Sequence, residues 1–324
     1  MFKKLKFIIL IVTCLVGGVV AGIFYDRNFN SCKDIYAYIN DRLVCNSEYV
    51  IKKHGYSELK DRLNEFIQSK DYSGEASEIS VYFRDLEDGP TLGINEHTFF
   101  SPASLFKVPY LITYLKLAEE EPALLDKKLV FRIEGKDPNE SQLLHPLKTI
   151  DENIPYTISE ILEKMIIYSD NRSVKVLANY LEQISPENDL FYETIYSIGI
   201  IAKDGREDDS ITVKSYASLF TLLYNASFLN NEMSERALTL LAKTDFNQGI
   251  KSGVPAPIEI SHKFGERYDL SKNTRQFHDC GIIYYPKNPY LLCIMTRGND
   301  FDKLIGIISS ISKMFYEEVD SRRI

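Results

Sequence analysis

The sequence predicts an α/β fold of the α+β type: an antiparallel sheet flanked by terminal helices, together with an all-helical lobe. Three observations predict this. Alternating apolar and polar residues, typical of strands, lie in the first and last thirds; helical periodicity fills the middle; and an amphipathic segment closes the chain. A basic and then apolar N-terminus adds a predicted transmembrane helix.

The N-terminus carries the signals of a membrane anchor. Lys3, Lys4 and Lys6 precede the uncharged run 7–25, close to the roughly 20 residues that a helix needs to cross a bilayer. Residues 1–25 are therefore predicted to be a cytoplasmic basic tip and a single-pass anchor in the lipid bilayer. The small residues at 19–22 leave a cleaved signal peptide as the alternative. We expect the rest of the chain to be extracytoplasmic at the cell membrane, or secreted if the segment is cleaved.

Residues 26–55 are predicted to be a juxtamembrane spacer and residues 56–324 one working domain. The first part of that domain is predicted to contain a helix, two strands, a helix and a short strand, at 56–67, 78–85, 91–95, 104–118 and 128–133. In the middle, Thr157 and Glu160 form a capping-box pattern before a helix, and three more helices follow, beginning near 171, 212 and 231. The last third is predicted to contain a strand at 258–264, a hairpin at 276–297 and a helix at 300–319.

Composition excludes several classes of protein. Of the 324 residues, 44% are hydrophobic and 26% charged, which is typical of a globular protein, and the net charge of -8 argues against a nucleic-acid partner. The chain has no phosphate-binding P-loop, and its five histidines are scattered. We therefore expect no cofactor, no metal and no nucleic acid, and we expect a monomer.

The first candidate for chemistry is Ser104-Leu105-Phe106-Lys107. At this spacing on a helix, the serine hydroxyl and the lysine amine share one face, so a neutral Lys107 can accept the proton of Ser104 as it attacks a carbonyl. The same spacing occurs at Ser57/Lys60 and Ser310/Lys313, which we interpret as solvated helix faces. Ser104 follows a plausible turn, so its backbone N–H is expected to be free for an oxyanion.

Two further segments complete a set. Ser169-Asp170-Asn171 lies between two predicted helices; it is interpreted either as a helix cap or as a proton relay and substrate contact. Four Lys-x-Gly segments occur, beginning at residues 53, 203, 251 and 263. Lys263-Phe264-Gly265 is chosen because it closes an alternating run typical of a strand, whereas Pro255 follows the segment at 251.

These three segments, in this order, resemble the S-x-x-K, S-D-N and K-T-G motifs of class A β-lactamases and other penicillin-recognising serine hydrolases. The resemblance covers about residues 56–319. It implies that Ser104 is the nucleophile, Lys107 its base and Ser169 a proton shuttle. It also implies that Asn171, Lys263 and Gly265 belong to the substrate site, and that the backbone N–H groups of Ser104 and Glu266 form an oxyanion hole. We further expect the Lys263 ammonium to bind a substrate carboxylate and to lower the pKa of Lys107 by repulsion.

The chain departs from that family at two places. Class A enzymes carry a Glu-x-x-Leu-Asn loop whose glutamate activates the deacylating water, and residues 199–212 contain no such pattern; Glu207, Asp208 and Asp209 are interpreted as a solvated charged loop. Phe264 stands where the family has a hydroxyl. The resemblance implies an acyl-enzyme on Ser104 with β-lactams or related amides, and the missing glutamate predicts that this acyl-enzyme is released slowly. The alternatives are a D,D-peptidase acting on peptidoglycan peptides and a penicillin-binding sensor that does not turn over.

The five cysteines indicate little about function. Cys32 and Cys45 flank a short segment outside the predicted anchor, where either a disulfide or two thiols fit. Cys280 and Cys293 lie in strand-rich sequence and are interpreted as buried core cysteines.

Overall fold

The computed structural model describes residues 6, 12, 14–20, 36–43, 55–87, 89–201 and 210–322. The chain divides into a small unit, Met1–Ala37 with Asp41–Glu48, and a large unit, Tyr38–Asn40 with Tyr49–Ile324. Within the described ranges, no helix has both the length and the apolar character that a membrane span requires. Most of the predicted anchor at 7–25, and both Cys32 and Cys45, lie outside the described residues.

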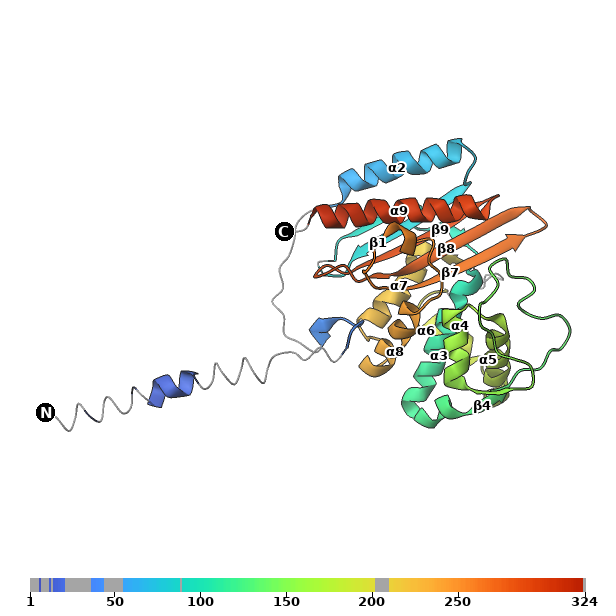
Figure 1. Cartoon of the computed structure of the whole chain (residues 1–324), viewed down its shortest axis with the longest axis horizontal. Coiled ribbons are helices and arrows are strands. Elements are labelled where there is room, and N and C mark those ends of the chain that lie inside the picture. Colours follow the sequence, from blue (N-terminus) through green and yellow to red (C-terminus); the bar gives the residue numbers. More distant parts are fainter. Residues whose placement is uncertain are drawn as a thin grey trace. The chain divides into compact units, whose positions relative to one another are not determined.

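A five-stranded antiparallel sheet, in the order β2-β1-β9-β8-β7, is the centre of the large unit (Figure 1). Its strands come from the two ends of the domain, as predicted: β1 Glu78–Asp85, β2 Thr91–Ile94, β7 Ile260–Asp269, β8 Thr274–Ile283 and β9 Tyr290–Gly298. The order leaves β7 at one edge, where it pairs with β8 alone among the described strands. That free edge faces the candidate site.

The terminal helices α2 (Ser57–Tyr72) and α9 (Phe301–Ser321) lie on one face of the sheet (Figure 1). Apolar side chains from α2, α9 and the inward positions of the strands form one core. Phe83 on β1 stacks on Phe315 of α9 with ring centroids 4.8 Å apart. The alternation in β1 and the helical stripe in α9 therefore bury against each other.

The other lobe is helical and lies on the opposite face of the sheet, where α7 packs against β9 and β1. Its helices are α3 Lys107–Glu120, α4 Ile158–Ile167, α5 Asn171–Ile184, α6 Leu190–Ser197, α7 Val213–Tyr224 and α8 Asn231–Ala242. Two-residue strands β3 (Phe99–Phe100) and β6 (Ile211–Thr212) pair with each other, and β4 (Lys128–Val130) pairs with β5 (Pro155–Thr157). Short 3₁₀ turns are η2 Ala103–Phe106, η3 Pro122–Asp126, η4 Lys251–Gly253 and, in the small unit, η1 Asp41–Leu43.

Local capping explains where several helices begin. The predicted capping box is confirmed: the Thr157 hydroxyl accepts from the Glu160 N–H, and the Glu160 carboxylate accepts from the Thr157 N–H. Asp170 caps α5 and Asp300 caps α9. The helix predicted over 104–118 differs from the structure, because residues 103–106 form the 3₁₀ turn η2 and α3 begins at Lys107. Helix α6 was not predicted.

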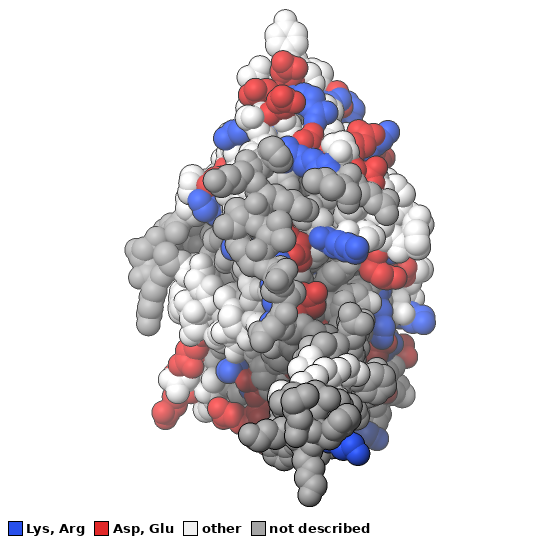
Figure 2. All heavy atoms as spheres, turned by 90° about the vertical axis from the view of Figure 1, so that its left-hand side faces the viewer, with Lys and Arg blue, Asp and Glu red and all other residues white. Residues whose placement is uncertain are grey.

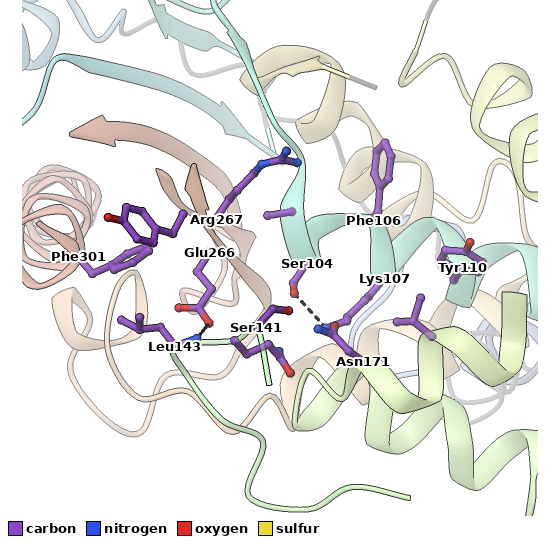
Figure 3. Close-up of a pocket in the computed structure, with 14 residues that line it drawn as sticks. Ser104, Phe106, Lys107, Tyr110, Ser141, Leu143, Asn171, Glu266, Arg267 and Phe301 are labelled. Atoms are coloured by element: carbon purple, nitrogen blue, oxygen red, sulfur yellow. Dashed lines mark hydrogen bonds between the residues drawn. The ribbon is translucent and has the colours of Figure 1, made fainter. Parts of the chain in front are cut away.

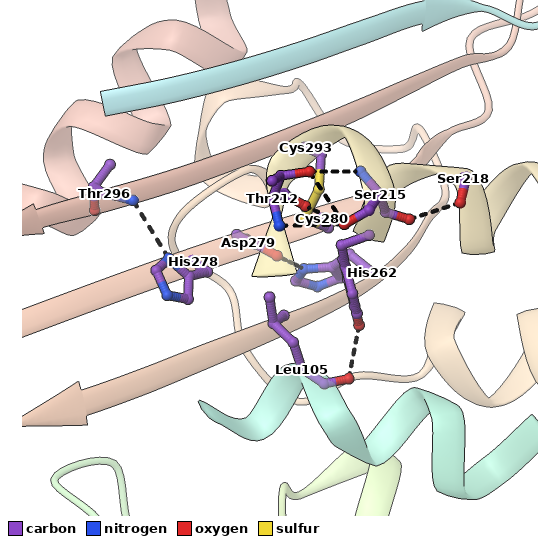
Figure 4. The surroundings of a disulfide bond; sticks show 11 residues. Leu105, Thr212, Ser215, Ser218, His262, His278, Asp279, Cys280, Cys293 and Thr296 are labelled. Carbon is purple, nitrogen blue, oxygen red and sulfur yellow. Dashed lines mark hydrogen bonds and ion pairs between the residues drawn. A yellow bond between two sulfur atoms is a disulfide. The ribbon is translucent and has the colours of Figure 1, made fainter. Parts of the chain in front are cut away.

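The interpretation of Cys280 and Cys293 as buried core cysteines is confirmed, but their pairing was not predicted. They are directly opposite each other on β8 and β9 and form a disulfide (Figure 4). Both are fully buried. In the same region the ring of His262 and the carboxylate of Asp279 make a buried contact of 2.9 Å. The pairing was missed because register, which places two cysteines side by side, is not visible in the separation of 13 residues.

Part of the predicted spacer contacts the domain. The backbone N–H groups of Tyr38 and Ile39 donate to the Glu235 carboxylate, and the Asn40 N–H donates to the Tyr224 carbonyl. The Ile39 side chain is buried. Residues 38–40 therefore belong to the folded domain that begins, in the sequence prediction, only at residue 56.

Candidate active site

Ser104 lies in the tight turn η2, held against the edge strand β7. Ala103 has a positive φ of 49°, which non-glycine residues adopt rarely. Gly265 makes the close approach of β7 possible: a Cβ there would lie 3.1 Å from the Leu105 nitrogen and 3.2 Å from the Pro102 oxygen. The glycine of the third motif thus brings the strand against the turn that carries the serine.

A chain of hydrogen bonds joins the three motifs. The Lys107 ammonium contacts Ser104 Oγ at 3.0 Å, Ser169 Oγ at 2.9 Å and the Ser169 carbonyl at 2.6 Å. Lys263 Nζ reaches the same Ser169 hydroxyl at 3.0 Å and also donates to the Phe264 carbonyl. Ser169 has a positive φ of 58°, and both its carbonyl and its hydroxyl accept from Lys107. The structure therefore brings Ser104, Lys107, Ser169 and Lys263 into one cluster.

Burial sets the electrostatics of this cluster. Lys107 is 3% exposed and Lys263 is 0% exposed. Burial lowers the pKa of Lys107 to about 7, although the carboxylates of Asp170 and Glu266 act in the opposite direction. Burial, followed by repulsion from Lys107, holds the pKa of Lys263 well below its ordinary value. The expectation that repulsion from Lys263 lowers the pKa of Lys107 is therefore corrected: burial is the main cause.

Asp170 fixes the junction between α4 and α5. Its carboxylate is completely buried and caps α5 by accepting from the Arg172 and Ser173 N–H groups. It also accepts from Asn139 Nδ2 at 2.8 Å and Thr149 Oγ1 at 2.7 Å, both on the long loop 131–154. Asp170 is thus a helix cap, as one interpretation held, and at the same time ties this loop to the site.

A cavity of about 420 Å³ opens beside this cluster (Figure 3). Of the predicted site residues, Ser104, Lys107, Asn171 and Glu266 line it. Apolar side chains form much of the rest of its wall: Phe106, Tyr110, Leu143, Val174 and Phe301.

The other predicted residues have different positions. Ser169 and Lys263 do not line the cavity; they lie behind Lys107 and are nearly or fully buried. The Asn171 amide donates to the Pro138 carbonyl at 3.1 Å. Phe264 stacks on Phe246 with centroids 4.3 Å apart, so it is part of the core. Lys251–Gly253 forms a 3₁₀ turn, which agrees with its exclusion as the third motif.

Glu266 contributes more than the backbone N–H that the sequence suggested. Its carboxylate oxygen Oε1 accepts the N–H groups of Leu143 and Leu144, each at 2.8 Å (Figure 3). Burial raises the pKa of Glu266, and those two bonds together with Lys107 and Lys263 oppose the rise. The side chain therefore links β7 to the loop 131–154 at the cavity.

Sequence reasoning missed the loop 131–154 as part of the site. Ser141, Gln142 and Leu143 line the cavity, and Gln142 Nε2 donates to the Ser169 carbonyl at 3.0 Å. The loop has no periodicity that would indicate a role. Its one usable signal was the polar turn Asp137-Pro138-Asn139.

The surface around this unit gives no sign of a continuous basic patch on the face in Figure 2, where Lys and Arg are interspersed with Asp and Glu among the described residues. A serine and a lysine of lowered pKa, set between an antiparallel sheet and a helical lobe, define the β-lactamase/transpeptidase-like fold of a serine hydrolase.

The particular family follows from comparison with known proteins. A model of the β-lactamase enzyme family matches residues 58–319. The chain belongs to this family, as its motifs predicted. It is 23% identical over 284 residues to a β-lactamase of Bacteroides uniformis, in an alignment that covers 83% of this chain and 93% of that protein.

Solved structures support the same fold. One is a variant of PBP-A in an acyl-enzyme complex with penicillin G, with a TM-score of 0.66 and 19% identity over 84% of this chain and 100% of that one. Another is a β-lactamase from Xanthomonas campestris, with a TM-score of 0.67 and 15% identity over 81% and 98% of the two chains. At these identities the likeness is one of fold.

Proposed function

We propose that this protein forms an acyl-enzyme on Ser104 with β-lactams or related amides and releases it slowly. The observation that carries the proposal is the contact of 3.0 Å between Ser104 Oγ and Lys107 Nζ, together with a pKa of about 7 for Lys107. A lysine with that pKa is neutral in about half of the molecules near pH 7, so it can accept the serine proton. The PBP-A variant, solved as an acyl-enzyme complex with penicillin G, carries the same kind of product.

The proposed acylation moves one proton along the hydrogen-bonded cluster. Ser104 Oγ attacks the amide carbonyl and its proton passes to Lys107; the developing oxyanion is held by the backbone N–H groups of Ser104 and Glu266. As the C–N bond breaks, Ser169 donates its hydroxyl proton to the leaving nitrogen and is reprotonated from Lys107. Lys263 keeps the Ser169 hydroxyl in place through its bond of 3.0 Å, and Asn171 contacts the substrate from the cavity wall.

Slow release follows from the missing deacylation base. The family's Glu-x-x-Leu-Asn loop is absent from the sequence, and Glu207, Asp208 and Asp209 lie outside the described residues. Water must then attack the ester without the glutamate that normally activates it. We propose the D,D-peptidase and the non-turnover sensor as the two alternatives that share the same acylation step.

The test is the intact mass of the full-length protein over time after addition of penicillin G. We expect the mass to rise by one penicillin molecule and the adduct to persist, and Ser104→Ala to remain unlabelled. Ser310→Ala is the matched control, because Ser310 and Lys313 have the same spacing on an exposed helix face. No adduct in the wild type overturns the proposal, and rapid turnover of a chromogenic cephalosporin contradicts slow release.

We also propose that residues 7–25 anchor a monomeric, extracytoplasmic domain in the cell membrane. The support is the uncharged run after Lys3, Lys4 and Lys6. Fractionation of cells that express the full chain, with protease added to intact spheroplasts, tests this. Recovery of the protein in the cytosol, protected from protease, contradicts it.

A further inference from the structure

The side chain of Glu266 is a second polar feature of the cavity, on the wall formed by β7 (Figure 3). It is a charged residue placed directly after Gly265, the glycine that lets β7 approach the turn of Ser104. It does not contact Ser104 or Ser169 through any hydrogen bond in the described part of the chain. The acylation scheme uses only its backbone, so the function of the carboxylate is unassigned.

Two side-chain oxygens at this cavity wall have no hydrogen-bond donor among the described residues. Glu266 Oε1 accepts two backbone N–H groups, whereas Oε2 is buried and has no donor among the described residues. The nearby Gln142 repeats the pattern: its Nε2 donates to Ser169, and its Oε1 is buried without a partner in the described ranges. Two buried acceptors at one cavity favour a ligand that brings hydrogen-bond donors.

The charge of Glu266 is also uncompensated at short range. No Lys, Arg or His of the described residues lies within ion-pair distance of its carboxylate. Lys107 and Lys263 interact with it electrostatically at longer range, but both have lowered pKa values. A partly buried anion of this kind gains most from a cation, because interactions there are screened less than at the surface. Leu143, whose backbone N–H donates to this carboxylate, lines the cavity and is 58% exposed, so its side chain is not held in the core.

We propose that Glu266, assisted by Gln142, is a specificity-determining residue that selects acyl substrates carrying a primary ammonium group close to the scissile amide. This inference rests on the proposed acylation of Ser104 and adds the substrate class. An ammonium supplies up to three N–H donors and one positive charge. It therefore satisfies both free acceptors and neutralises the carboxylate, which a neutral aryl or alkyl substituent does not.

The experiment compares penicillin G with ampicillin, which differs from it by one α-amino group. The rate of adduct formation on the full-length protein is measured near pH 7 by intact mass for both compounds. We expect ampicillin to acylate the wild type about tenfold faster, the effect of one good charge-assisted hydrogen bond. In Glu266→Gln, which keeps the size and an acceptor for Leu143 and Leu144, the ratio of the two rates should fall to within about twofold of one.

The control variant is Glu163→Gln, which makes the same change of charge at an exposed position of α4; it should keep the wild-type ratio. Equal rates for the two penicillins in the wild type, or the same ratio in Glu266→Gln as in the wild type, overturn the selectivity while leaving acylation intact. If Glu266→Gln does not fold, the wild-type ratio alone decides. If neither penicillin labels Ser104, the proposed function fails and this inference fails with it.

Discussion

Two carboxylates at the site, those of Asp170 and Glu266, differ in how fully they are bonded. The Asp170 carboxylate accepts from backbone, amide and hydroxyl donors on α5 and on the loop 131–154. Glu266 uses one oxygen for two N–H groups and leaves the other without a donor among the described residues. A fully bonded acid holds the scaffold in place, whereas a half-bonded acid at a cavity keeps capacity for a ligand.

The largest expected effect is on stability and tests whether the Asp170 carboxylate holds the structure around the site together. Asp170→Ala removes the buried carboxylate that accepts from Asn139 Nδ2, Thr149 Oγ1 and Ser173 Oγ. We expect the free energy of unfolding to fall by about 3–5 kcal/mol, measured by urea denaturation. Asp71→Ala, at an exposed position of α2, is the control and should change stability by less than about 0.5 kcal/mol. A similar small loss for both variants would contradict the scaffold role.

The second effect concerns the rate of acylation. Because Lys107 must be neutral to accept a proton and its pKa is about 7, the rate should rise with pH and level off above that value. Below it we expect about a tenfold loss for each pH unit, measured with penicillin G. A flat profile down to about pH 5 would exclude Lys107 as the base.

The third effect is the dependence of stability on pH. Lys107 titrates near 7 in the folded protein and near 10.5 when exposed, so between these values the unfolded chain binds the extra proton. The free energy of unfolding should therefore increase with pH there, by up to about 1.4 kcal/mol per unit for each such lysine. Lys263 acts in the same direction. Replacement Lys107→Met should reduce the slope, and an unchanged slope would argue against the lowered pKa.

The smallest effect completes the comparison with Asp170. Glu266→Ala removes two bonds to an exposed loop but also a buried oxygen that lacks a donor among the described residues. The loss of the two hydrogen bonds and the removal of the unpaired buried oxygen have opposite effects on the free energy of unfolding. We therefore expect it to change by less than about 1 kcal/mol, measured by the same urea denaturation. A loss as large as that of Asp170→Ala would show that Glu266 too is mainly structural.

Much of the fold was predictable because its signals are local. The alternation of β1 and the capping box of α4 each lie within one segment, and both were found at the predicted residues. The family was also predictable, because the order of three short motifs is written in the sequence. What was not predicted depends on contacts between distant segments: the pairing of Cys280 with Cys293, and the burial of Phe264 against Phe246.

The residues of the site were predictable from the sequence, but which of them line the cavity and which are buried was not. The motifs gave Ser104, Lys107, Ser169 and Lys263, which the fold brings together. Nothing in the sequence indicated that Lys263 would lie behind the cavity wall, or that the loop 131–154 would close over Glu266. Both depend on which side of an edge strand meets solvent, and local periodicity does not carry that information.

The docking of residues 38–40 onto α7 and α8 has a practical consequence for anyone preparing this protein. A shortened protein that starts at residue 56 would lack the backbone N–H groups of Tyr38 and Ile39, which donate to the Glu235 carboxylate. It would also expose the surface that buries the Ile39 side chain. Expression should begin upstream of Tyr38, so that the purified protein keeps residues 38–40 and their contacts with the folded domain.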